Sequence, residues 1–128
     1  MSKILVIDDE PGIRELLDTL LSRKGYDVIL ADSGQTGLEI YRRAHPDFVV
    51  LDLKMPGMDG LTVLQQVRRL NPTQPVIVLT GAGTPETEQQ VRALGVTEFV
   101  EKAFSLHLLG DALKRLLVHT EPFGTLAR

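Results

Sequence analysis

Five short apolar runs recur along this chain, and segments with a helical spacing of apolar residues separate them. The first run, Lys3–Ile7, is continuously apolar after its lysine, which is typical of a strand buried on both faces. The segment from Pro11 to Gly25 has an apolar residue every three or four positions, which predicts an amphipathic helix. The other predicted strands are Val28–Ala31, Phe48–Leu51, Val76–Leu79 and about Thr97–Glu101.

Capping residues and helix breakers delimit the helices between these strands. Ser33 is the expected N-cap of the second helix, which His45 and Pro46 stop. The fourth helix, about Glu86–Leu94, has few apolar residues, so we expect it to pack lightly. A last helix is expected near 106–117, where leucines recur at helical spacing.

Five strand–helix units in succession predict an α/β fold, a doubly wound five-stranded parallel sheet with helices on both faces. Five strands fit the flavodoxin-like order 2-1-3-4-5, with a switch point between the first and third strands where ligands bind. We expect one domain over residues 1–118. Residues 119–128 lack helical periodicity and are interpreted as a C-terminal tail or the start of a linker.

Composition narrows the possible functions without choosing one. The chain has 128 residues, no cysteine and a formal net charge of −3, which excludes thiol chemistry and argues against nucleic-acid binding. No apolar run approaches the roughly 20 residues that span a bilayer, so no membrane association is expected. The first residues do not form a secretory signal, and the cytoplasm is the expected location.

Polar residues stand where four of the predicted strands end. Asp8 and Asp9 follow the first strand, Asp52 the third, Thr80 the fourth and Lys102 the fifth. Each residue alone has an ordinary explanation as a strand-closing, helix-capping or solvated side chain. Because the carboxyl ends of parallel strands share one edge of the sheet, we expect all five to lie close together.

Such a set of side chains suits a divalent cation and a phosphoryl group. Three converging carboxylates repel one another and raise the pKa of at least one of them, and Mg²⁺ with its preference for oxygen ligands would relieve that repulsion. Asp52 is then a workable phosphoryl acceptor. The Thr80 hydroxyl and the Lys102 ammonium would stabilise the phosphoryl oxygens.

The residues at these strand ends carry a resemblance to a known family. The chain resembles a response-regulator receiver domain of two-component signalling over about residues 2–118. The most specific motif is the string from Asp52 to Gly60, Asp-Leu-Lys-Met-Pro-Gly-Met-Asp-Gly. The supporting segments are Ile4–Glu10, Leu79–Gly81 and Glu101-Lys102.

The resemblance implies a role for each site residue. Asp52 would accept a phosphoryl group from a phosphohistidine on a sensor histidine kinase or phosphotransfer protein, with the domain promoting only its own phosphorylation and dephosphorylation. Asp9, Asp52 and the backbone carbonyl of Lys54 would hold Mg²⁺, with Asp8 acting through a water molecule. Lys102 and Thr80 would contact the phosphoryl oxygens.

The resemblance also implies a conformational switch. Thr80 would move toward the phosphoryl group, the ring of Phe99 would turn inward, and the surface of the fourth helix, fifth strand and fifth helix would change. Homodimerisation on phosphorylation is a possible consequence. The alternative is that Phe99 is a static core residue.

One position departs from the family pattern. Receivers usually have Lys-Pro at the end of the fifth strand, commonly with a cis bond, whereas this chain has Lys102-Ala103. A cis bond costs roughly 3 kcal/mol before a non-proline residue, against about 0.5–1 kcal/mol before proline. We therefore expect either a trans bond with a redirected loop or a strained cis bond.

Three other functions compete with this interpretation. A degenerate receiver that acts as an interaction module is the main alternative. An Asp-nucleophile phosphatase needs a second acid two residues after its nucleophile, where this chain has Lys54. A flavin-binding protein needs a phosphate-binding loop after the first strand, where acidic residues would repel phosphate. Any output domain lies outside this sequence, and its nature is left open.

Overall fold

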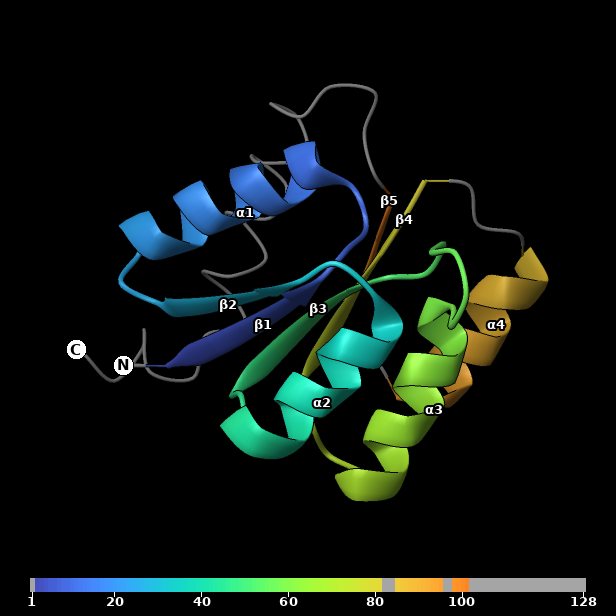
Figure 1. Ribbon diagram of the computed structural model, residues 1–128. Coiled ribbons are helices and arrows are strands. Elements are labelled where there is room, and N and C mark those ends of the chain that lie inside the picture. The colour runs from blue at the N-terminus through green and yellow to red at the C-terminus, as the bar shows by residue number, and fades with distance from the viewer. Residues whose placement is uncertain (1, 82–84, 96–97, 102–128) are drawn as a thin grey trace.

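The computed structural model describes residues 2–81, 85–95 and 98–101. Over these ranges the chain forms a parallel sheet of five strands in the order β2-β1-β3-β4-β5, which confirms the predicted fold class and strand order (Figure 1). The strands are β1 (Lys3–Ile7), β2 (Asp27–Ala31), β3 (Phe48–Asp52), β4 (Val76–Thr80) and β5 (Glu98–Glu101). The predicted last helix near 106–117, the tail 119–128 and the Lys102-Ala103 bond lie outside the described residues.

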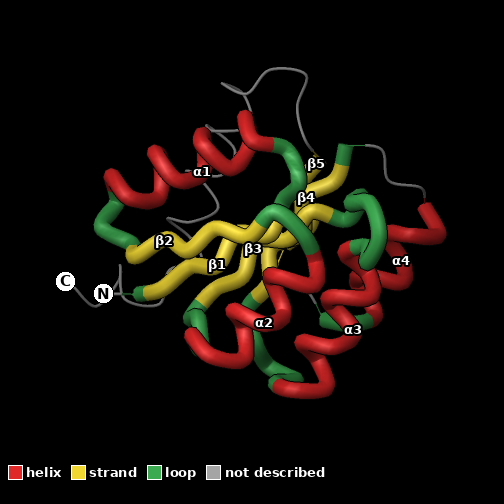
Figure 2. Tube along the Cα trace, in the orientation of Figure 1, coloured by secondary structure: helices red, strands yellow, loops and turns green. Residues whose placement is uncertain are grey.

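Helices cover both faces of this sheet, as Figures 1 and 2 show. Helix α1 packs on one face, while α2, α3 and α4 lie on the other. Each face therefore has its own apolar cluster, and the central strands contribute alternate residues to the two clusters. The helices are α1 (Pro11–Arg23), α2 (Gly34–Ala44), α3 (Gly60–Leu70) and α4 (Pro85–Ala93).

Local sequence signals account for where the helices begin. The Ser33 hydroxyl accepts a hydrogen bond from the Thr36 amide at 3.2 Å, which confirms the predicted cap of α2. Asp59 caps α3 in the same way, with the Thr62 amide donating to its carboxylate at 2.9 Å. Within the described part of the chain, no helix is long and apolar enough to cross a membrane.

Helix α4 is attached differently from its neighbours. Val91 is its one buried residue, as the sparse apolar pattern predicted. At its C-terminal end, the Arg68 guanidinium of α3 donates hydrogen bonds to the carbonyl oxygens of Leu94 and Gly95, the latter at 2.8 Å. A positive charge at the carbonyl end of a helix also interacts favourably with the helix dipole. Val91, the partly buried Leu94 just after the helix and the Arg68 hydrogen bonds thus hold α4 in place.

Candidate functional site

Two of the predicted carboxylates come from neighbouring strands in the middle of the sheet. Strands β1 and β3 pair in parallel, with Ile7 opposite Leu51, so the residues that follow these two, Asp8 and Asp52, lie side by side at the carboxyl edge. Both are almost completely buried, with exposed fractions of 0% for Asp8 and 1% for Asp52. The strand order therefore brings together two acids that are far apart in the sequence.

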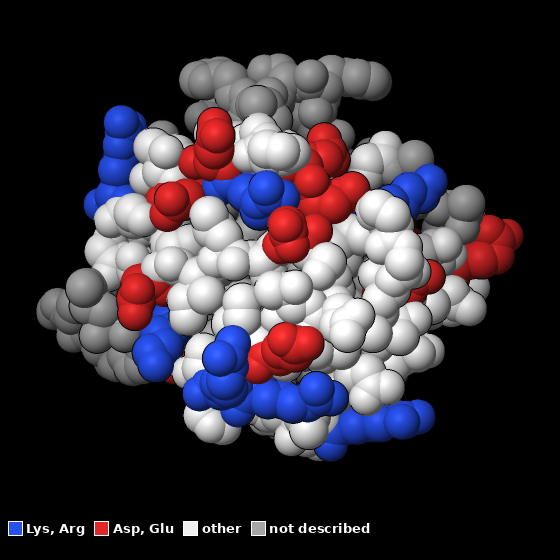
Figure 3. Space-filling view, in the orientation of Figure 1, with Lys and Arg blue, Asp and Glu red and all other residues white. Residues whose placement is uncertain are grey.

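Four acidic residues converge at this point. Carboxylate oxygens of Asp8, Asp9, Glu10 and Asp52 all lie within 4.8 Å of one another. Asp9 is half-buried and Glu10 is exposed, so the cluster runs from the interior to the surface. Glu10 was not among the predicted site residues; its position directly after the predicted pair was the available signal. Figure 3 shows acidic side chains gathered over this edge of the sheet.

Backbone amides orient the two buried carboxylates. The Glu10 amide donates to Asp8 Oδ1 at 2.9 Å, and the Lys54 amide donates to Asp52 Oδ1 at 3.2 Å. In both cases the donor lies two residues after the acid, an arrangement typical of aspartate at the start of a turn. Each carboxylate is therefore held in position by the loop that follows its own strand.

Arg14 brings a positive charge to this loop, and it was not among the predicted site residues. Arg14, in the first turns of α1, donates from Nη1 to the carbonyl oxygen of Asp8 at 2.8 Å. Its spacing of four residues from Glu10 places it on the same side of the helix, which was the only sequence signal for this contact. Arg14 joins the start of α1 to the loop that carries the acids.

The loop after β3 closes tightly on Asp52. A Cβ atom at Gly60 would lie 2.2 Å from the Asp52 carbonyl oxygen and 2.6 Å from the Leu53 Cα, so only glycine fits there. The Gly60 amide donates to the Leu53 carbonyl at 2.9 Å, while Asp59 caps α3. The last two residues of the Asp52–Gly60 string therefore hold the first turn of α3 beside the candidate phosphoryl acceptor.

The remaining predicted residues are located by backbone position only. In the β3–β4 pairing Asp52 lies opposite Leu79, so Thr80 is the next residue along the same edge. Phe99 lies in β5 opposite Val78 of β4. Lys54 is exposed, and its amide contacts Asp52 as described. Lys102 lies outside the described residues.

The donor set fits a hard divalent cation. It consists of carboxylate oxygens only, two of them on buried acids that would repel each other strongly in a medium of low dielectric constant. Mg²⁺ prefers such oxygen ligands and commonly binds through one or two carboxylates plus water. The residues present are thus chemically suited to hold Mg²⁺.

Comparison with known proteins assigns the chain to a family. The sequence model of the response regulator receiver domain matches residues 4–114, and the chain belongs to this family of two-component signalling domains. It is 36% identical over 115 residues to sporulation initiation phosphotransferase F of Bacillus subtilis, covering 90% of this chain and 93% of that protein. It is 46% identical over 115 residues to the probable transcriptional regulator ycf27 of Porphyridium aerugineum, covering 90% of this chain but only 48% of that protein.

The fold agrees with solved receiver structures. The response regulator TrrA of Thermotoga maritima, in complex with Mg²⁺-BeF, superimposes with a TM-score of 0.75 at 35% identity. The superposition covers 91% of this chain and 100% of the TrrA chain. The chain therefore spans nearly the whole of some relatives and about half of others such as ycf27.

Proposed function

We propose that this chain is a phospho-accepting receiver that takes a phosphoryl group onto Asp52 from a phosphohistidine of a sensor histidine kinase or phosphotransfer protein. The observation that carries the proposal is the burial of Asp52 within a cluster of four acids at the carboxyl edge of the sheet. Four carboxylates whose oxygens lie within 4.8 Å of one another repel, so the cluster points to a bound cation and to charge chemistry at Asp52. The relative crystallised with Mg²⁺-BeF supports the same chemistry.

The reaction is a transfer between two nucleophiles. An Asp52 carboxylate oxygen attacks the phosphorus atom, an oxygen–phosphorus bond forms, and the phosphorus–nitrogen bond to the donor histidine breaks. The hydrogen bond from the Lys54 amide holds the carboxylate in one orientation for this attack. Later attack by water on phosphorus breaks the bond to the Asp52 oxygen, releases inorganic phosphate and returns Asp52 to its free carboxylate.

The site residues divide the remaining tasks. Asp9, Asp52 and the Lys54 backbone carbonyl would hold Mg²⁺, and Asp8 would act through a bound water. When bound, Mg²⁺ neutralises the crowded carboxylates and the phosphoryl oxygens. The Thr80 hydroxyl and the Lys102 ammonium would donate to those same oxygens.

We further propose that phosphorylation shifts the surface of α4, β5 and the helix expected after β5. Thr80 and Phe99 would carry the shift, since Thr80 ends β4 beside Asp52 and Phe99 lies on the neighbouring strand. The light attachment of α4, with Val91 as its one buried residue, supports its role as the element that moves. Homodimerisation through this surface is a corollary.

The proposed setting is the cytoplasm, with a kinase or phosphotransfer partner and an output that another domain or protein supplies. The receiver would occupy residues 1–118. Residues 119–128 would form a tail or linker. Two relatives support an output outside the receiver. One is a phosphotransferase of similar length, and the other is a longer probable transcriptional regulator.

The test is phosphoryl uptake from a small-molecule donor such as acetyl phosphate, read by intact mass with and without Mg²⁺. We expect one added phosphoryl group that requires Mg²⁺ and is labile to base. Asp52→Asn should abolish uptake, whereas Asp59→Asn, which alters an exposed helix cap in the same loop, should retain it. A folded protein that binds Mg²⁺ but takes up no phosphoryl group, even from a histidine phosphotransfer protein, would instead support the degenerate interaction module.

A further inference from the structure

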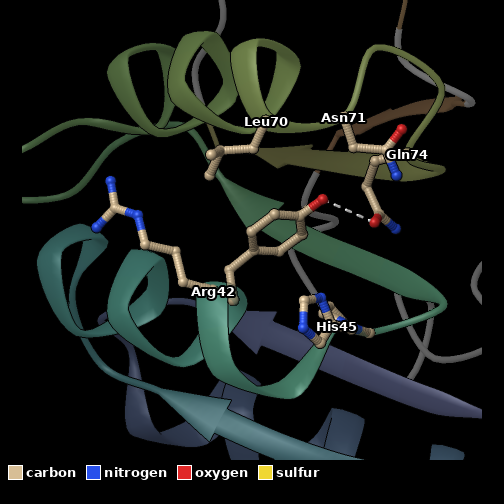
Figure 4. Close-up of a pocket in the computed structure, with 7 residues that line it drawn as sticks. Arg42, His45, Leu70, Asn71 and Gln74 are labelled. Atoms are coloured by element: carbon tan, nitrogen blue, oxygen red, sulfur yellow. Dashed lines mark hydrogen bonds between the residues drawn. The ribbon is translucent and has the colours of Figure 1, made fainter.

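A hollow lies at the opposite end of the sheet from the acidic cluster. It has a volume of about 540 Å³ and sits between the C-terminal ends of α2 and α3, near the start of β4 (Figure 4). This volume is within the range of sites that hold one or two side chains or a small ligand. We call it the terminal pocket, and it is lined by Tyr41, Arg42, His45, Pro46, Leu70, Asn71 and Gln74.

The floor of the terminal pocket is held by its own hydrogen bonds. The Tyr41 hydroxyl donates to Gln74 Oε1 at 2.9 Å, as the dashed line in Figure 4 marks. Gln74 Nε2 in turn donates to the carbonyl oxygens of Asp47 at 3.1 Å and Pro75 at 3.2 Å. Both side chains are buried. These hydrogen bonds fix the side chains of the floor, which lowers the entropic cost of binding.

The rim combines an exposed apolar side chain with the positive charge of Arg42. Leu70 is 51% exposed, the highest value among the large apolar residues of the described ranges. Arg42 and His45 are exposed at the C-terminal end of α2, and Figure 4 shows Leu70 on the facing helix and the Arg42 side chain directed away from His45. An apolar contact and a charge thus lie within one small opening.

The charge around the terminal pocket is positive although the whole chain is acidic. None of its lining residues is acidic, and the last turns of α2 and α3 carry Arg42, Arg43, Arg68 and Arg69. Basic side chains gather at these two helix ends in Figure 3. Interaction with the helix dipoles explains arginines in last turns, but it does not explain an exposed leucine between them. Within the ranges that the structure describes, the ion pair found is Arg92 with Glu88, so Arg42 can pair with an external carboxylate.

A second hollow extends the same surface along the two helices. It has a volume of about 460 Å³, and Arg42 lines it together with Leu38 and Glu39 of α2 and Met58 before α3. Among the described residues Arg42 is its only cationic lining residue, so the carboxylate of the ligand belongs there. Because one arginine borders both hollows, an extended segment can occupy them in turn. A compact small molecule would use only one of them.

We propose that the terminal pocket docks a short acidic segment of a partner protein, with one apolar side chain seated beside Leu70 and an adjacent carboxylate on Arg42. Complementary charge and the apolar anchor together favour a peptide over nucleic acid, whose phosphates would use the arginines but leave Leu70 exposed. This surface lies at the opposite end of the sheet from the site around Asp52 and shares no lining residue with the acidic cluster.

The test uses peptides with the repeated pattern Asp-Glu-Phe-Asp-Glu and follows the backbone amides of the ¹⁵N-labelled protein by NMR. We expect shifts confined to the lining residues of the two hollows, with a dissociation constant on the order of 100 μM. Arg42→Gln and Leu70→Ser should each weaken binding about three- to fivefold. Arg23→Gln is the matched control, since Arg23 occupies the last turn of α1 on the other face of the sheet.

Three results would overturn the proposal. Equal affinities for Arg42→Gln and Arg23→Gln would show that binding follows overall charge alone. Equal binding of a peptide with alanine in place of phenylalanine would show that no apolar side chain of the peptide contributes to binding. Displacement of the peptide by a short oligonucleotide at equal concentration would identify the patch as a phosphate site. Circular dichroism of each variant separates these results from unfolding.

Discussion

The two ends of the sheet both bury polar side chains, but they do so in opposite ways. At the carboxyl end, Asp8 and Asp52 lie in a cluster of four acids whose oxygens are within 4.8 Å. At the amino end, the Tyr41 hydroxyl donates to Gln74 Oε1, and Gln74 Nε2 donates to two backbone carbonyls. The first arrangement concentrates charge of one sign, and the second pairs donors with acceptors.

This difference indicates a reactive site at the carboxyl end and a purely structural network at the amino end. We call the amino-end network of Tyr41, Gln74, Asn71 and Arg68 the joint. Paired polar groups add stability and hold elements together, because each buried donor finds an acceptor. Like charges held together lower stability until a cation or another charge compensates them. The amino-end network extends through the Asn71 carbonyl, which accepts from Arg68 at 3.3 Å, to the end of α4. The joint thus reaches the helix that we expect to move.

The largest effect should come from breaking the joint at Arg68. Arg68→Met removes three hydrogen bonds from a charged donor to backbone carbonyls, and we expect a loss of about 2 kcal/mol in the free energy of unfolding. Amide hydrogen exchange near Val91 should accelerate, because α4 would keep only its single buried contact. The control is Arg69→Met, one residue on and exposed. Equal effects of the two variants would contradict the assignment.

A smaller loss is expected from Tyr41→Phe. This change removes the donor to the buried Gln74 Oε1 while leaving the ring in place, and it should lower the free energy of unfolding by about 1–2 kcal/mol. Urea unfolding of Tyr41→Phe, Gln74→Ala and the double variant measures the coupling between the two side chains. Strict additivity of the single effects would show that their hydrogen bond contributes nothing.

At the carboxyl end of the sheet, removing a charge should raise the free energy of unfolding instead of lowering it. Asp8→Asn keeps an oxygen for the Glu10 amide but removes one charge from the cluster, so the free energy of unfolding without divalent cations should rise by about 1 kcal/mol. The added stability that Mg²⁺ confers on the native sequence should shrink in this variant. Asp32→Asn, an exposed acid after β2, is the control and should change little. Destabilisation by Asp8→Asn would remove the contrast between the two ends.

The smallest effect concerns alkaline pH. Burial raises the pKa of Tyr41, although the Asn71 side chain and the Arg68 charge partly oppose this. Because the charged tyrosinate is less favourable in the folded state, stability is fully present below the unfolded pKa of about 10 and falls as pH rises above it. Urea unfolding between about pH 9 and 11 should show a shallower decline for Tyr41→Phe. An unchanged slope would mean that Tyr41 does not titrate differently on folding.

Sequence patterns predicted most of the architecture because they depend on local physics. Continuous apolar runs mark β1, β3 and β4, since strands buried on both faces need no polar residues. The edge strand β2 begins one residue earlier than predicted, at Asp27. Its pattern was weaker because an edge strand is only partly covered. The predicted meeting of Asp8 with Asp52 followed from parallel strand order alone.

The contacts that the sequence did not indicate are all long-range. Nothing local pairs Tyr41 with Gln74, 33 residues apart, or Arg68 with the carbonyls of Leu94 and Gly95. The close approach of Gly60 to Asp52 likewise depends on how α3 packs against β3. Such contacts form only when the helices pack on the sheet, because packing geometry and not residue spacing decides which side chains meet.

By itself, the sequence determined the elements, their alternation and the acids at the strand ends, because periodicity, caps and turns act over a few residues. The tertiary structure alone decided that Glu10 joins the acidic cluster, that Arg14 reaches its loop and that a pocket opens between the ends of α2 and α3. These features depend on distances between separate elements, which side-chain packing fixes.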